Sequence, residues 1–143
     1  MGATPFRVLF LCTGNSARSI LAEALLPHLG GSEYESCSAG SQPTGIVNPL
    51  ALETLGLHGV PLSDPRSKSW DEFADAEPMD LIVTVCDQAA GEVCPVWPGQ
   101  PRTTHWGIPD PAAVEGSESE RRAAFEFAYG ELERLILKFL ESR

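Results

Sequence analysis

A cysteine and an arginine near the start of the chain enclose a run of small residues. Cys12 and Arg18 flank Thr-Gly-Asn-Ser-Ala, and Ser19 follows. Small side chains allow successive backbone N–H groups to turn inward around an anion, and a guanidinium can bind two oxygens of a tetrahedral oxyanion at once. The pattern predicts an oxyanion-binding loop formed by Thr13, Gly14, Asn15, Ser16, Ala17, Arg18 and Ser19.

Cys12 is the residue of this loop that could do covalent chemistry. The thiolate is the nucleophilic form of cysteine, and it is favoured beside an arginine and a helix N-terminus. Ser16 or Ser19 can donate a hydrogen bond to it, and the sequence does not choose between them. The alternative is an ordinary loop thiol. The position of the pattern between a buried strand and a helix favours a nucleophile.

Hydrophobic patterning predicts the elements around the loop. Residues 6–11 form a nearly continuous apolar run, which is typical of a strand buried on both faces of a parallel sheet. Apolar residues then recur at helical spacing from Ile20 to Leu29, and Gly30-Gly31 ends the pattern. Pro27 lies inside this helix, and we expect it to kink the helix or to end it early.

The rest of the chain repeats this alternation of strands and helices. We expect strands at residues 34–38, 80–85 and 103–106, a helix after Asn48-Pro49 that Gly56 closes, an irregular segment over 91–111, and a last helix that begins with a capping box of Ser117 and Glu120. Such alternation is typical of a doubly wound α/β domain, here with about four parallel strands flanked by helices. We expect a single domain over residues 1–143, with its ligand at the carboxyl ends of the strands.

Composition narrows the classes of function. The 143 residues carry a formal net charge of -10 at pH 7, which argues against binding nucleic acid or an anionic membrane through the overall field. No apolar run approaches the ~20 residues of a membrane span, and we find no signal peptide. We therefore expect a cytoplasmic monomer that binds its anion through a local device.

The loop Leu-Cys-Thr-Gly-Asn-Ser-Ala-Arg-Ser closely resembles that of the low-molecular-weight phosphotyrosine phosphatases and of the arsenate reductases that share their fold. Three further stretches are similar to the arsenate reductase branch: residues 38–40 with 47–49, residues 83–87, and residues 94–96 leading to residues 105–111. The phosphatases usually place two aromatic residues after an Asp-Pro pair, whereas Ala112-Ala113 follows Asp110-Pro111 here. The resemblance implies an arsenate reductase.

The resemblance also implies roles for further residues. Cys12 would attack arsenic while Asp110 donates a proton, and Cys86 would then attack Cys12 and release arsenite. Cys94 would carry the oxidation outward as a Cys86–Cys94 disulfide, which thioredoxin, or glutaredoxin with glutathione, would reduce; no cofactor would be bound. Eight residues of helix span ~12 Å, beyond the roughly 4.4–6.8 Å between the Cα atoms of a disulfide, so residues 87–96 would have to bend or unwind.

Simpler interpretations of these residues stay open at the level of sequence. Cys86 could be a small apolar residue at a strand end, Cys94 a loop thiol, and Asp110 the cap of a turn. We expect Cys37 to be a buried structural thiol, and we expect His105 and Trp106 to steer the loop that carries Asp110.

We predict no bound metal. A zinc site made of Cys86, Cys94 and His105 lacks the closely spaced cysteine pairs of structural sites. Some relatives hold a monovalent cation near the residues that match Asn15 and Glu23, together with a further carboxylate. Lys68 stands where that carboxylate would be expected.

Two other classes of function could use the same loop. A hydrolase of phosphotyrosine or of small phosphoesters would share the first chemical step, and a non-catalytic oxyanion binder would need no nucleophile. Reduction of arsenate needs two electrons, which the two further cysteines can supply and which a phosphatase does not need. The chemistry therefore favours the reductase.

Overall fold

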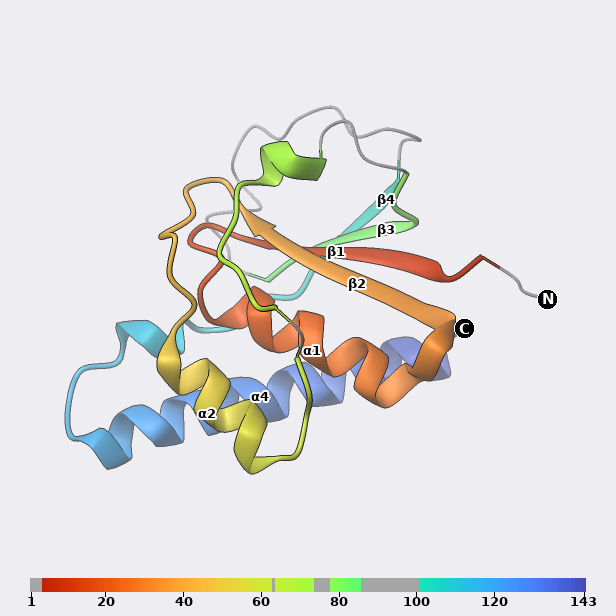
Figure 1. Ribbon diagram of the computed structural model, residues 1–143. Coiled ribbons are helices and arrows are strands. Elements are labelled where there is room, and N and C mark those ends of the chain that lie inside the picture. The colour runs from red at the N-terminus through yellow and green to blue at the C-terminus, as the bar shows by residue number, and fades with distance from the viewer. Residues whose placement is uncertain (1–3, 63, 74–77, 86–100) are drawn as a thin grey trace.

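A computed structural model describes residues 4–62, 64–73, 78–85 and 101–143 (Figure 1). Its centre is a sheet of four parallel strands in the order β2-β1-β3-β4. The strands are β1 (Phe6–Cys12), β2 (Tyr34–Gly40), β3 (Leu81–Thr84) and β4 (Arg102–His105). This sheet confirms the predicted α/β class and the predicted four parallel strands.

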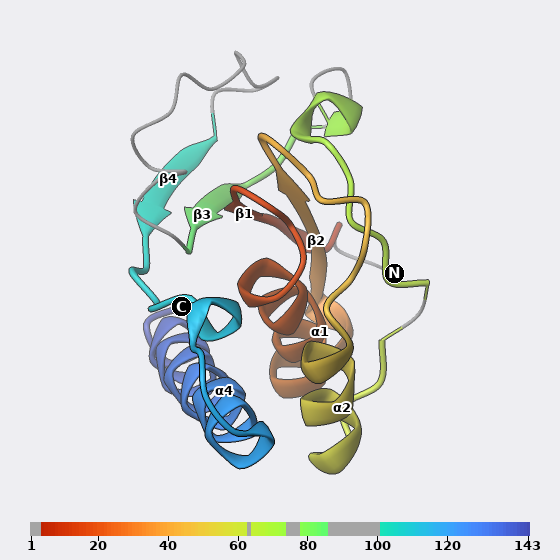
Figure 2. The same ribbon diagram turned by 90° about the vertical axis from the view of Figure 1, so that its left-hand side faces the viewer.

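Helices flank the sheet as predicted. The helices α1 (Arg18–Gly30), α2 (Pro49–Leu57) and α4 (Glu118–Glu141) lie together on one face of the sheet, as Figures 1 and 2 show. The short 3-10 helix η2 (Trp70–Phe73) lies over the other face, and η1 (Gly31–Glu33) and η3 (Pro111–Ala113) lead into β2 and toward α4. The predicted capping box at the start of α4 is confirmed, since Ser117 and Glu120 hydrogen-bond reciprocally.

The strand β1 separates two cores. Val8 and Phe10 pack with the helices, whereas Leu9 and Leu11 pack with Ala39, Met79 and Ile82 on the opposite face. Each of these β1 side chains is at most 1% exposed, which explains the unbroken apolar run from Val8 to Leu11. Burial of each such side chain contributes about 1.5–3 kcal/mol, so β1 is held firmly on both faces.

The expectation that Pro27 ends α1 early is wrong, because the helix continues through it to Gly30. A proline cannot donate to the carbonyl four residues earlier, so the carbonyl of Glu23 needs another partner. The hydroxyl of Ser36, on the neighbouring strand β2, donates to that carbonyl. The tertiary contact therefore satisfies the group that proline leaves open.

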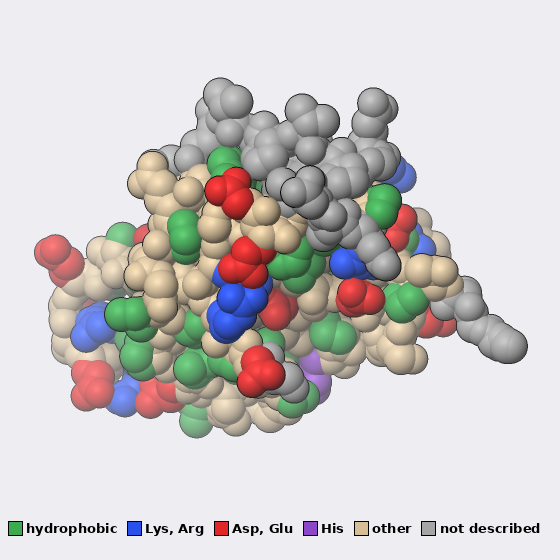
Figure 3. All heavy atoms as spheres, turned by 45° about the horizontal axis from the view of Figure 1, so that its top comes forward, with side chains coloured by type: hydrophobic (Ala, Val, Ile, Leu, Met, Phe, Trp, Pro, Cys, Tyr) green, Lys and Arg blue, Asp and Glu red, His purple; other side chains and the backbone are tan. Residues whose placement is uncertain are grey.

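Charged side chains are mixed on the face that Figure 3 shows, where acidic and basic groups alternate over the described surface. No helix within the described ranges combines the length and the apolar character that a membrane crossing requires.

Candidate active site

An open cavity of about 1030 Å³ lies at the carboxyl end of β1. The loop from Cys12 to Arg18 forms one wall, Gln42 and Thr44 form a second, and residues 107–110 with Ala112 form a third. The parallel strands bring these segments to one edge, because β1 and β2 pair with Cys12 opposite Gly40 and residues 106–108 continue β4. Of the predicted oxyanion-binding residues, Thr13, Gly14, Ser16, Ala17 and Arg18 line the cavity, whereas Asn15 and Ser19 are fully buried.

The N-terminus of α1 borders the cavity and has no side-chain cap. Asn48 caps α2, Ser117 caps α4 and Asp110 caps η3, each through a side-chain oxygen that accepts from the backbone. Ala17, at the start of α1, provides no such cap, and the first turn holds no acidic residue. A helix N-terminus carries partial positive charge and unpaired N–H groups, so an oxyanion in the cavity would serve as its cap.

Three backbone carbonyls of the loop accept hydrogen bonds from the segment that follows β2. The N–H groups of Gln42, Thr44 and Asn48 donate to the carbonyls of Thr13, Gly14 and Ser16, over 2.9, 3.0 and 2.8 Å. Asn15 has φ 46°, a left-handed conformation that turns successive N–H groups toward one side. The loop is therefore held in a shape that offers N–H donors to an anion.

Ser19, and not Ser16, faces the thiol of Cys12. Ser19 Oγ lies 3.0 Å from Cys12 Sγ, and the backbone N–H of Asn15 donates to the same sulfur at 3.3 Å. Asn15 accepts from the backbone N–H of Lys68 through Oδ1, so its Nδ2 group donates to Ser19 at 2.8 Å. Ser19 accepts that bond and keeps its single hydrogen for the sulfur. The sulfur of Cys12 therefore has two hydrogen-bond donors directed at it, the Ser19 hydroxyl and the backbone N–H of Asn15.

Arg18 joins the loop to the segment that carries Asp110. One guanidinium nitrogen donates to the carbonyl of Ile108 at 2.9 Å, and the other lies 3.6 Å from Asp110 Oδ2. Asp110 also accepts from the backbone N–H of Ala112, so it does cap η3, as the simpler interpretation of this residue allowed. Its second oxygen remains at the cavity wall, where a proton donor to a leaving group would have to stand.

Two further expectations concern residues outside the cavity. Burial and the nearby Glu23 raise the pKa of the Cys37 thiol to about 12, which fits a structural thiol. His105 Nδ1 lies 2.7 Å from the Thr84 hydroxyl, and the ring of Trp106 packs against Phe10. Both contacts fix the chain just before the Asp110 segment.

Cys86 and Cys94 lie outside the described residues. Cys86 is bonded to Val85, a buried residue whose N–H donates to the carbonyl of Leu11 at 2.9 Å, next to Cys12. The carbonyl of Val85 accepts from Ile108 at 3.1 Å. Within the described ranges, no group of His, Cys, Asp or Glu side chains is arranged to hold a metal ion.

Several residues of the site were missed by the sequence prediction. Gln42 and Thr44 brace the loop through backbone bonds, which no side-chain pattern announces. Ser38 belongs to a stretch that supported the resemblance, but its bond to Asn15 at 2.9 Å was not predicted. The pairing of β2 beside β1 would have been the only signal for these contacts.

Known proteins resemble the chain in sequence and in structure. Residues 7–142 match the family described as low molecular weight phosphotyrosine protein phosphatase. Arsenate reductases of Halalkalibacterium halodurans and Bacillus subtilis are 38% and 35% identical to the chain, over 94% of its length and 95% of their own.

Two solved structures are also similar to the chain. A thioredoxin-dependent arsenate reductase of Corynebacterium glutamicum is 30% identical with a TM-score of 0.69, and the match covers 99% of this chain and 66% of that one. The tyrosine phosphatase amsI of Erwinia amylovora is 27% identical with a TM-score of 0.76, over 99% and 95% of the two chains. The chain belongs to the low molecular weight phosphotyrosine protein phosphatase family.

Proposed function

We propose that the protein reduces arsenate to arsenite, with Cys12 as the nucleophile. The observation that carries this proposal is the similarity to arsenate reductases over 94% of the chain at 35–38% identity. The cavity supports the proposal, because its lining suits a tetrahedral oxyanion. It brings together the buried Cys12 thiol with its Ser19 hydroxyl, the uncapped N-terminus of α1 and the Arg18 guanidinium.

The first step is attack on arsenic by the Cys12 thiolate. A Cys12 S–As bond forms, and one arsenate oxygen leaves as water after it takes a proton from Asp110. Arg18 and the N–H groups of the loop hold the remaining oxygens, which carry the negative charge. Arsenic is still pentavalent at this stage, so no electron has moved.

The second step transfers two electrons. The Cys86 thiolate attacks the sulfur of Cys12; a Cys12–Cys86 disulfide forms, and the pair of electrons of the S–As bond stays with arsenic, which leaves as arsenite. Cys94 then attacks Cys86, so that a Cys86–Cys94 disulfide forms and Cys12 is released as a thiol. An external dithiol such as thioredoxin, or glutaredoxin with glutathione, reduces that disulfide. The attachment of Cys86 to Val85, beside Leu11, supports the reach of the second step.

A phosphatase is the second candidate, favoured by the likeness to the Erwinia tyrosine phosphatase. It would use the same attack by Cys12 on phosphorus, followed by water. The wall after Asp110 argues against aryl phosphates as the main substrates, because Ala112 lines the cavity where the phosphatases usually present aromatic residues. We expect ester hydrolysis to be a slow side reaction.

Steady-state turnover tests the proposal. Arsenate-dependent oxidation of NADPH would be measured with thioredoxin and its reductase, and in parallel with glutaredoxin, glutathione and its reductase. Cys12→Ser should abolish turnover in both systems, whereas Cys94→Ser should abolish it only if thioredoxin is the donor. Rapid hydrolysis of nitrophenyl phosphate without any arsenate-dependent oxidation would instead establish the phosphatase.

A further inference from the structure

Lys68 and Glu23 form a buried ion pair that none of these steps uses. The Lys68 ammonium lies 3.8 Å from Glu23 Oε1, and the two side chains are only 8% and 17% exposed. The ammonium also donates to the carbonyl of Arg66 at 3.1 Å. A buried pair of charges adds little net stability, because both groups lose their hydration. Its place in the fold therefore needs another reason.

Three polar side chains connect Glu23 to the nucleophile. Ser38 donates to Glu23 Oε1, and Asn15 Nδ2 donates both to Ser38 and to Ser19. Ser19 in turn faces the sulfur of Cys12 at 3.0 Å. All three are fully buried, so water does not compete for these bonds.

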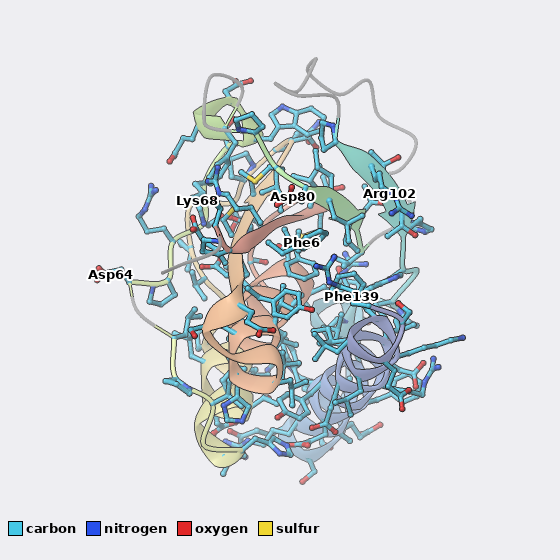
Figure 4. All side chains as sticks on the ribbon, turned by 90° about the vertical axis from the view of Figure 1, so that its right-hand side faces the viewer. Phe6, Asp64, Lys68, Asp80, Arg102 and Phe139 are labelled. Atoms are coloured by element: carbon cyan, nitrogen blue, oxygen red, sulfur yellow. The ribbon has the colours of Figure 1, made fainter. Side chains whose placement is uncertain are left out.

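We propose that Lys68 is a positioning residue for the nucleophile, acting through Glu23 on the hydrogen bonds that end at Cys12. Figure 4 shows Lys68 beside the sheet. Its ammonium lies against Glu23 of α1, and neither residue lines the cavity, so Lys68 can neutralise Glu23 without entering the cavity. The inference rests on the proposed role of Cys12. In this proposal the Lys68–Glu23 pair affects the ionisation of Cys12 and does not bind the substrate.

Loss of the ammonium would disfavour the thiolate in either state of Glu23. If Glu23 stayed ionised, its uncompensated negative charge would oppose a second negative charge on Cys12. If Glu23 took up a proton, its bond with Ser38 would lose the assistance of charge, and such assistance roughly doubles the strength of a hydrogen bond. Asn15 would then be held less firmly, and Ser19 with it. Both routes predict the same direction of change.

Other charged groups surround the Lys68–Glu23 pair, and one of them, Arg66, provides a control variant. Arg66 is paired with Glu72 at 2.8 Å on the surface, and its side chain is 59% exposed. Its field also reaches Glu23. The thiol of Cys37 lies within the field of the pair and also within that of Arg7 and Glu35, and Glu72 lies within the field of Lys68. Arg18 and Asp110 line the cavity with Cys12. Arg66→Met removes the same charge as Lys68→Met close by and leaves the backbone carbonyl that binds the ammonium.

The test measures the reactivity of Cys12 directly. The reduced, full-length protein is treated briefly with iodoacetamide between pH 4.5 and 9, and the labelled Cys12 peptide is quantified by mass spectrometry. In Lys68→Met we expect the profile to move to higher pH by about 0.5–1 pH unit, so that labelling on the acid limb of the profile slows about three- to tenfold. Lys68→Arg should recover most of the reactivity, and Arg66→Met should match the wild type. Thermal unfolding is followed for each variant.

Chemical rescue distinguishes the loss of the Lys68 ammonium from a general structural effect of the substitution. Lys68→Ala leaves room beside Glu23, so methylammonium should restore Cys12 labelling, whereas tetramethylammonium at equal ionic strength should not. A Lys68→Met profile that coincides with the wild type, or a shift of equal size in Arg66→Met, would overturn the inference. A chain that shows the expected shift but reduces no arsenate would refute the proposed function and leave the role of Lys68 standing.

Discussion

Gly40→Ala should damage the oxyanion loop without touching any side chain of the site. Gly40 is the last residue of β2 and pairs with Cys12. A Cβ atom at this position would lie 2.4 Å from the carbonyl oxygen of Thr13, 2.9 Å from that of Cys12 and 3.0 Å from the backbone nitrogen of Asn15. All three atoms belong to the backbone of the loop, so no side chain can rotate away to make room.

The size of the effect follows from these distances. A contact of 2.4 Å must open to at least 3.0 Å, a displacement of about 0.6 Å at Thr13. The loop cannot retreat freely, because the N–H of Gln42 donates a hydrogen bond to the same carbonyl at 2.9 Å. A misplacement of ~1 Å costs about 100-fold in rate, so we expect kcat/KM for arsenate to fall about 10- to 100-fold. We also expect a loss of about 1–3 kcal/mol in the free energy of unfolding.

Arsenate turnover and thermal unfolding would be measured together, with Gly130→Ala as the matched control. Gly130 lies within α4, where a Cβ atom would meet nothing within 4 Å. Alanine there should leave activity unchanged and stabilise the helix by up to about 1 kcal/mol. If Gly40→Ala folds and keeps activity within threefold of the wild type, the close approach of β2 does not shape the loop and the reasoning is refuted.

Three further predictions concern single side chains. Arg18→Lys should lower kcat/KM for arsenate about 100- to 1000-fold in steady-state assays, because an ammonium cannot hold two oxygens in a planar fork; wild-type activity would contradict this. Ser19→Ala should slow Cys12 alkylation at pH 6 several-fold and Ser16→Ala should not, because Ser19 alone of the two contacts the sulfur. Burial raises the pKa of Cys37 from 9.0 to about 12, so its neutral form favours the folded state. This contribution to the free energy of unfolding is present below pH 9 and is lost as pH rises toward 12. The wild type should therefore lose stability relative to Cys37→Ala when unfolding is measured at increasingly alkaline pH. If the stabilities of the two proteins fall in parallel with pH, Cys37 ionises freely.

Much of the fold could be predicted because local patterns and long-range packing agree. Residues 8–11 are apolar throughout because both faces of β1 are buried there, and the Ser117/Glu120 box marks the start of α4. Pro27 was misjudged because the partner of the freed Glu23 carbonyl, Ser36, comes from the neighbouring strand. Local sequence holds no information on that contact.

In the candidate site, too, the local pattern could be predicted and the long-range contacts could not. Cys12, Arg18 and the loop between them form one contiguous pattern, so their placement around a cavity could be predicted. The choice of Ser19 over Ser16 depends on the turn of the loop, and the bond of Asn15 to the backbone of Lys68 joins residues 53 positions apart. Such contacts follow from the order of parallel strands, which spacing alone does not specify.

The central claim, that this chain supplies the electrons for arsenate reduction, is tested most directly by a single turnover. Fully reduced protein is mixed with arsenate without any external reductant, and arsenite and free thiols are counted. We predict about one arsenite for each chain, the loss of two thiols and no arsenite from Cys12→Ser, since one disulfide carries two electrons. Unchanged thiols and no arsenite, together with fast release of phosphate from an ester, would contradict the claim.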